Sequence, residues 1–169
     1  MFWRGIFAVL LCLCSVGVAH AYEDQITLGV GAGYAYGVSD SPPNHAALFD
    51  LSVSAGLSAE FSLRTRLSYG LFPASEPVHA LLLGGELLYL VDVVEFVPYV
   101  GLGLDGFGRL SAGATELDAA THLVLGVDYL VSRDLTLGID LRPHLVFTDV
   151  KRRPVVIALV ASAIWMFDQ

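Results

Sequence analysis

The sequence predicts an all-β fold: an eight-stranded antiparallel up-and-down transmembrane β-barrel with a polar, salt-bridged lumen. Three observations lead to this fold class. Hydrophobic residues make up 55% of the chain and charged residues only 15%, which is too apolar for an ordinary soluble domain. Apolar residues alternate with small or polar ones, as side chains alternate between the two faces of a strand. Aromatic residues collect at both ends of the alternating segments, as at the two interfaces of a membrane.

The first 21 residues are typical of a secretory signal peptide. Arg4 supplies positive charge, the stretch 6–18 is apolar, and Ala19-His20-Ala21 fits the rule of small residues around a cleavage site. The alternative is an uncleaved membrane anchor, but the apolar stretch is short for a span. We therefore expect cleavage after Ala21 and a single barrel domain over residues 22–169.

Charge and cysteine content narrow the possible functions. The chain has 9 Lys and Arg residues against 17 Asp and Glu residues. This balance argues against binding to nucleic acid, because phosphates are neutralised by basic side chains. Both cysteines, Cys12 and Cys14, lie within the expected signal peptide. The mature chain would then have no disulfide, no thiolate nucleophile and no cysteine metal ligand.

Eight segments carry the period of two, each roughly 9–14 residues long, which suits tilted strands that cross a bilayer. They are 26–36, 49–57, 61–71, 78–92, 96–105, 117–129, 135–147 and 154–167. The connections alternate in character. Tight turns are expected near 58–60, 92–95 and 131–134, and mostly longer loops over 37–47, 73–77, 106–116 and 148–153.

The aromatic residues fall into two groups, which predict two membrane belts. At the loop ends of the strands are Tyr34, Tyr36, Phe49, Tyr69, Phe72, Phe107 and Phe147. At or near the turn ends are Phe61, Tyr89, Phe96, Tyr129, Trp165 and Phe167.

One face of each strand is rich in Leu, Val, Ile and aromatic residues, and the other in Gly, Ser, Ala and charged residues. Large apolar side chains suit contact with lipid, and small ones suit the crowded interior of a narrow barrel. Lipid tolerates no open sheet edge, so the sheet has to close. The predicted lumen charges are Arg64, Arg66, Glu86, Asp105, Asp118, His122, Asp128, Asp140, Arg142 and His144.

This pattern resembles the small eight-stranded outer-membrane barrels of the OmpA/OmpX type. The two-faced strands carry the resemblance, together with GLGLD at 101–105 and the last strand, on which Trp165 and Phe167 face outward. One departure is that Asp168 and Gln169 follow Phe167, whereas the family typically ends on an aromatic residue. The resemblance implies a multi-pass protein of the outer membrane, surrounded by lipid and inserted by the barrel-assembly machinery.

The lumen charges predict internal ion pairs. A charge in a narrow lumen costs several kcal/mol unless it is paired or hydrated, so Arg64 or Arg66 should meet Glu86 on the next strand. A glycine two residues before an acid recurs on four strands, as at Gly84 and Glu86, and we expect both to face inward. The charges then form a structural salt-bridge plug or, alternatively, a gated conductance pathway or a proton-sensitive lumen. The narrow bore of an eight-stranded barrel favours the plug.

Neither a metal site nor a cofactor is expected. His122, His144 and Asp118 can be drawn as a metal site, but the chain lacks His-x-His or cysteine spacing.

We also do not expect an enzyme. Some small outer-membrane barrels modify lipids, which requires a Ser, His and acid set at the rim. Ser75, Glu76 and His79 could form one, but a histidine in a proline-bounded loop is usually only solvated.

The predicted function is therefore structural: an integral barrel with a plugged lumen that contributes to envelope integrity. A narrow channel for ions or small solutes is the first alternative, and a lipid-modifying enzyme is the second. The loops carry no recognisable code for a ligand or a protein partner.

Overall fold

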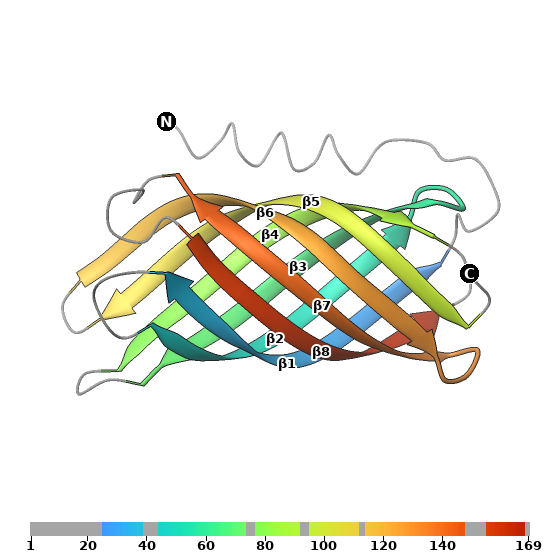
Figure 1. The fold of residues 1–169 in the computed structure, drawn as a ribbon, viewed down its shortest axis with the longest axis horizontal. Helices are drawn as coiled ribbons and strands as arrows, with labels where there is room; N and C mark the ends of the chain where they lie inside the picture. The colour runs from blue at the N-terminus through green and yellow to red at the C-terminus, as the bar shows by residue number, and fades with distance from the viewer. Residues whose placement is uncertain are drawn as a thin grey trace.

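The structure is a computed structural model that describes residues 25–38, 44–73, 77–91, 95–111, 114–147 and 155–167. In these ranges the chain forms one closed antiparallel sheet, with the strands in the order of the sequence (Figure 1). The strands are β1 (Ile26–Val38), β2 (His45–Gly56), β3 (Phe61–Phe72), β4 (Val78–Leu90), β5 (Phe96–Ser111), β6 (Ala114–Leu130), β7 (Leu135–Val146) and β8 (Val155–Phe167). The expected signal peptide lies outside the described residues.

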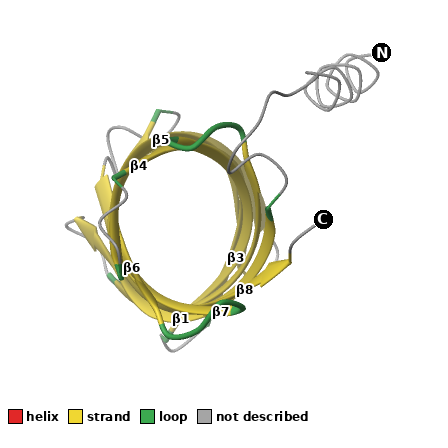
Figure 2. Cartoon of the chain, turned by 90° about the vertical axis from the view of Figure 1, so that its right-hand side faces the viewer, coloured by secondary structure: helices red, strands yellow, loops and turns green. Residues whose placement is uncertain are grey.

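The barrel closes where the first strand pairs with the last. Ile26 of β1 lies opposite Phe167 of β8, and the antiparallel register continues to Val38 opposite Val155. Viewed from the end, the strands form a complete ring (Figure 2). Closure leaves no unpaired sheet edge, which is the condition for a sheet in lipid. The predicted fold class is confirmed.

The strands are long enough to cross a membrane at a tilt. They contain 12 to 17 residues. At about 3.3 Å per residue and a tilt of about 40°, twelve residues span roughly 30 Å, the thickness of the hydrocarbon core. Among the described residues, no helix has the length and apolarity needed to cross a membrane.

Two of the three predicted tight turns, near 58–60 and 131–134, are present at one end of the barrel, and most of the third, near 92–95, lies outside the described residues. The backbone N–H groups of Leu57 and Ser58 donate to the carbonyl of Phe61, and those of Val131 and Ser132 donate to that of Leu135. These bonds join β2 to β3 and β6 to β7. We call this the turn end and the opposite end the loop end.

The loop expected over 106–116 is wrong, because most of it is strand. β5 continues to Ser111 and β6 begins at Ala114, with these two residues paired. Gly106 and Gly108 suggested a turn, but their backbone is held between two neighbours: Gly106 pairs with Leu83 of β4 and Ala119 of β6. Pairing on both sides outweighs the low strand propensity of glycine.

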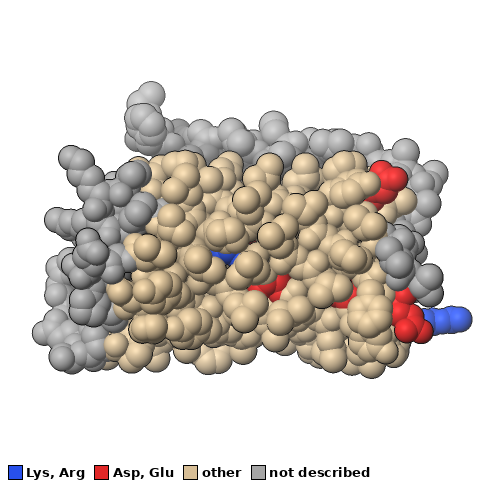
Figure 3. Space-filling model, in the orientation of Figure 1, with Lys and Arg blue, Asp and Glu red and all other residues tan. Residues whose placement is uncertain are grey.

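The outer face of the described strands is apolar, and the side of the barrel that faces the viewer in Figure 3 carries few charged residues. Leu102 and Leu104 on β5 are 63% and 68% exposed, whereas Gly103 between them is buried. The same alternation runs along the other strands. The barrel is therefore apolar on its outer face and polar on its inner face, the reverse of a soluble barrel.

Two aromatic residues assigned to the loop-end belt lie inside the barrel instead. Phe72 and Phe107 are only 5% and 8% exposed, because they stand at inward positions of β3 and β5 and not at outward ones. They belong to an apolar layer at the loop end of the lumen. The other members of this layer are Ala35, Ala46, Leu48, Ala80, Ala158 and Val160.

Candidate functional site

The middle of the lumen holds a connected group of ionisable side chains, which we call the charge plug. Each projects from an inward position of its strand, and together they come from β2 to β7. The plug consists of Asp50, Arg64, Arg66, Glu86, Asp105, His122, Asp140, Arg142 and His144.

Glu86 is the centre of the charge plug and is 1% exposed. Its Oε2 lies 2.7 Å from both Nε and Nη2 of Arg64. Its Oε1 contacts Nη2 of Arg66 and lies 2.9 Å from Nε2 of His122. Both arginines thus contact Glu86. A buried carboxylate with this many partners is compensated for its loss of water.

A second branch of the plug runs through Arg142. Its Nη2 donates to Oδ2 of Asp140 at 2.8 Å, and its Nη1 contacts Oδ2 of Asp50. Asp140 also accepts from the hydroxyl of Tyr99 at 3.3 Å, and the guanidinium of Arg64 lies 5.4 Å from the centre of the Tyr99 ring. Tyr99 is buried at an inward position of β5, and the period of two along this strand was the signal that could have identified it.

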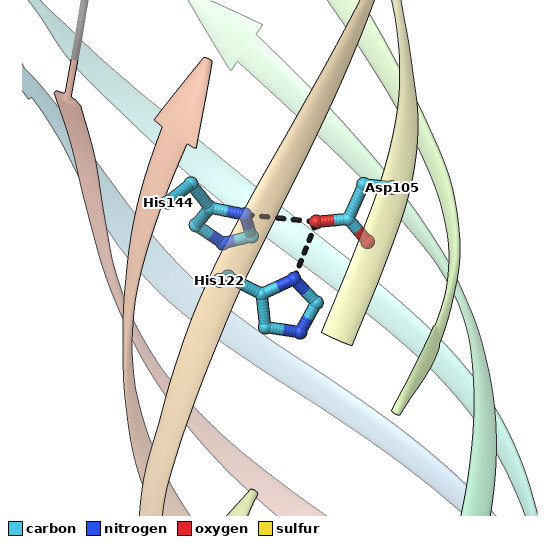
Figure 4. A group of neighbouring side chains, drawn as sticks. All are labelled: Asp105, His122 and His144. Atoms are coloured by element: carbon cyan, nitrogen blue, oxygen red, sulfur yellow. Dashed lines mark hydrogen bonds and ion pairs between the residues drawn. The ribbon is translucent and has the colours of Figure 1, made fainter. Parts of the chain in front are cut away.

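The third branch joins Asp105, His122 and His144, which point toward one another from β5, β6 and β7 (Figure 4). Oδ2 of Asp105 lies 2.7 Å from Nδ1 of His122 and 2.9 Å from Nδ1 of His144. The acid beside the two histidines is therefore Asp105 and not Asp118, which we had considered as their partner. Asp118 instead pairs with Arg109 at 2.8 Å.

Inward glycines make space for these side chains. A Cβ on Gly84 would lie 1.8 Å from Oδ1 of Asp105, and one on Gly103 would lie 2.3 Å from Cε1 of His122. A Cβ on Gly138 would lie 2.3 Å from Oδ1 of Asp128. Each glycine thus makes room for a side chain on a neighbouring strand, rather than for the acid two residues further along its own strand.

Cavities lie on both sides of the charge plug. A cavity of about 110 Å³ at the turn end has Arg64 and Asp128 on its wall. A smaller one, of about 30 Å³, lies toward the loop end and has Arg66, Arg142 and the two buried phenylalanines on its wall. The plug therefore separates a roomy turn end from a tightly packed loop end.

Asp128 stands apart from the plug. It lies in the turn-end cavity, and its Oδ1 is buried without a hydrogen-bond partner.

Apart from Phe72 and Phe107, the residues of both predicted belts are exposed on the outer face. These are Tyr34, Tyr36, Phe49, Tyr69 and Phe147 toward the loop end, and Phe61, Tyr89, Phe96, Tyr129, Trp165 and Phe167 toward the turn end. At the turn end, Phe61 packs on Tyr89 with ring centres 5.3 Å apart, and Phe96 packs on Tyr129 at 4.9 Å.

Of the catalytic set considered from the sequence, only His79 lies within the described residues. His79 lies in β4 and not in a loop, and its Nδ1 is 2.5 Å from the hydroxyl of Tyr69 on the adjacent strand. Ser75 and Glu76 lie outside the described residues.

No model of a known protein family matches the chain, and no curated protein matches it in sequence. Solved structures do match. The chain is similar to Neisserial surface protein A, with 14% identity and a TM-score of 0.68 over 85% of this chain and 96% of the other. It is similar to Ail, the attachment invasion locus protein of Yersinia pestis, with 11% identity and a TM-score of 0.61 over 86% and 99%. It is also similar to the outer membrane enzyme PagL, with 10% identity and a TM-score of 0.53 over 82% and 97%.

These structures confirm the expected likeness to small outer-membrane barrels. At identities this low, the structural likeness establishes a shared fold and nothing more. The matched proteins include both an attachment invasion locus protein and an enzyme. The role of this chain therefore has to be argued from its own side chains.

Proposed function

We propose that the chain is an integral outer-membrane barrel with a structural role in the cell envelope, and that the charge plug keeps its lumen closed. The signal peptide would be removed after Ala21, and the barrel-assembly machinery would insert the mature chain. The turn end would face the periplasm and the loop end the outside, as is usual for bacterial barrels with short turns and longer loops.

The observation that carries this proposal is the pairing of the plug. Arg64, Arg66 and His122 all contact Glu86. Arg64 of β3 also lies 3.8 Å from Asp140 of β7, so the ion pairs extend across the lumen. An eight-stranded barrel is just wide enough for its interior to be filled by side chains. Ions would have to break these buried pairs in order to pass.

Whether the lumen is closed can be tested by measuring ion conductance across a planar bilayer that contains the barrel. The wild-type barrel is expected to give no steady current steps. The double variant R66A/E86A removes a paired cation and anion together, and we expect it to open small steps. The variant E60A, changed in an exposed turn, is the control and should stay silent. Steady wild-type steps that disappear when Arg66 or Glu86 is changed would instead support the narrow channel.

Envelope integrity is tested in the host cell. Deleting the gene should increase entry of a large apolar antibiotic, and the wild-type chain should restore the barrier. Unchanged entry after deletion would contradict the structural role.

A lipid-modifying enzyme is the remaining alternative, because PagL shares the fold and because His79 and Tyr69 form a polar pair on the outer face. We expect purified barrel mixed with outer-membrane lipids to leave their masses unchanged. Lipid cleavage that is lost in H79A would favour the enzyme.

A further inference from the structure

Asp105, His122 and His144 bring three metal-binding atoms together inside the barrel (Figure 4). One ligand atom from each residue lies within 4.8 Å of the other two. Imidazole nitrogens and a carboxylate oxygen are the ligands that zinc and similar transition metals use in proteins. The three residues come from consecutive strands, so the sheet itself fixes their spacing.

Nδ1 of each histidine lies close to the same carboxylate oxygen. Oδ2 of Asp105 is 2.7 Å from Nδ1 of His122 and 2.9 Å from Nδ1 of His144. Two atoms that bind one metal ion at about 2.0–2.2 Å each lie roughly 3 Å apart. Both nitrogens are therefore already at the distance from the oxygen that a shared ion requires.

The other ring nitrogen of His122 has the partner that a metal-bound histidine usually has. Nε2 lies 2.9 Å from Oε1 of Glu86. A carboxylate in this position fixes the tautomer and the ring orientation of a metal ligand. Arg64 and Arg66 hold Glu86 in turn, so the outer shell of the cluster is itself rigid.

Charge and space also favour a cation here. In the described part of the chain, the ion pairs of the three plug arginines run to Glu86, Asp50 and Asp140, which leaves Asp105 to the histidines. Asp105 and His144 line the loop-end cavity of about 30 Å³, and the two arginines on its wall, Arg66 and Arg142, are paired with Glu86 and Asp50. A cavity of this size has room for a water molecule, which would complete a four-coordinate site.

We propose that Asp105, His122 and His144 form a binding site for a divalent transition-metal ion of the zinc class, with an open position facing the loop-end cavity. The ion would join β5, β6 and β7 inside the barrel. This inference goes beyond the proposed closing role and can be tested separately from it, because metal binding is measured on the isolated barrel in detergent.

Calorimetric titration with Zn²⁺ tests the site, using the processed chain without a histidine tag. We expect one ion per barrel. H144A and D105N should each weaken binding by more than about 100-fold, beyond the loss usual for an outer-shell partner. The double variant H45A/H79A removes two histidines outside the plug and should bind as the wild type does. Absent wild-type binding, or binding lost only in the control, would overturn the proposal.

Electron paramagnetic resonance with Cu²⁺ in place of Zn²⁺ identifies the ligands in the wild-type barrel, so this test does not depend on whether the variants fold. The wild-type spectrum should show coupling to two imidazole nitrogens. A spectrum without nitrogen coupling would overturn the proposal even if the variants fail to fold.

Discussion

Oε2 of Glu86 lies 2.7 Å from two nitrogens of Arg64, and both side chains are almost entirely buried. This two-pronged contact joins β3 to β4, where the two residues lie directly opposite each other. In the pair, each charged group takes the place of the water that the other has lost. If one partner were removed, the buried charge that remained would destabilise the fold.

E86A should therefore destabilise the barrel by about 3–5 kcal/mol, because it leaves two buried arginines without their central carboxylate. Urea unfolding in lipid vesicles measures this change. Trp165 is the fluorescent reporter, since Trp3 lies in the expected signal peptide. E60A, in an exposed turn, should change stability by no more than about 0.5 kcal/mol. Equal stability of the two variants would contradict the central role of Glu86.

Two adjacent glycines on β4 offer a matched pair. A Cβ at Gly84 would lie 1.8 Å from the Asp105 carboxylate and 2.7 Å from the carbonyl oxygen of Leu104, whereas one at Gly85 would have no atom within 4 Å. G84A should lower the free energy of unfolding by about 1–3 kcal/mol through overpacking, and G85A should not lower it. The same urea experiment measures both. If G85A lowered the free energy of unfolding as much as G84A does, then strand propensity, and not the space in the lumen, would determine the effect of both substitutions.

The lipid-facing wall should tolerate a charge only near its ends. Leu104 lies in the middle of β5 and is 68% exposed, and Leu117 lies near the loop end of β6 and is 81% exposed. L104R should cost about 2–4 kcal/mol and L117R about 0–1 kcal/mol, as for arginine at the bilayer midplane and near an interface. Refolding into vesicles followed by urea titration gives both values. If the costs were equal, β5 and β6 would not cross the bilayer as proposed.

Arg142 bridges two acids through different nitrogens, with Nη2 on Asp140 and Nη1 on Asp50. Lysine keeps the charge but has one ammonium group and no planar fork. R142K should therefore lower stability by about 1–3 kcal/mol, the range for a buried polar group that loses its partner. R133K, in an exposed turn, is the matched control. If R142K were as stable as the wild type, a positive charge at this position would be sufficient without the planar fork of arginine.

The two faces of each strand could be predicted from sequence because strand geometry fixes them locally. Leu102 and Leu104 had to face one way and Gly103 the other, whatever the partner strands were. The end of β5 could not be predicted in this way. Gly106 and Gly108 are typical of turns, and only pairing with β4 on one side and β6 on the other keeps them extended.

The composition of the lumen and the contact of Arg64 and Arg66 with Glu86 could likewise be predicted from sequence, but the pairing of Asp105 with His122 could not. Asp118 and His122 share a face of β6, yet four residues of strand separate them by roughly 13 Å. Asp105 reaches His122 because Gly103 stands directly opposite His122, which makes Asp105 its diagonal neighbour. That register depends on the alignment of two strands, and the period of two does not determine it.

The pairing of β1 with β8 makes completion of this protein an all-or-none event. A chain that ended before Val155 would contain seven of the strands, but β1 and β7 would each have a row of backbone N–H and C=O groups facing hydrocarbon. No partial stability is available from such an intermediate in lipid, since each unsatisfied group costs several kcal/mol. Premature termination, even close to the end of translation, should therefore yield no membrane-resident fragment.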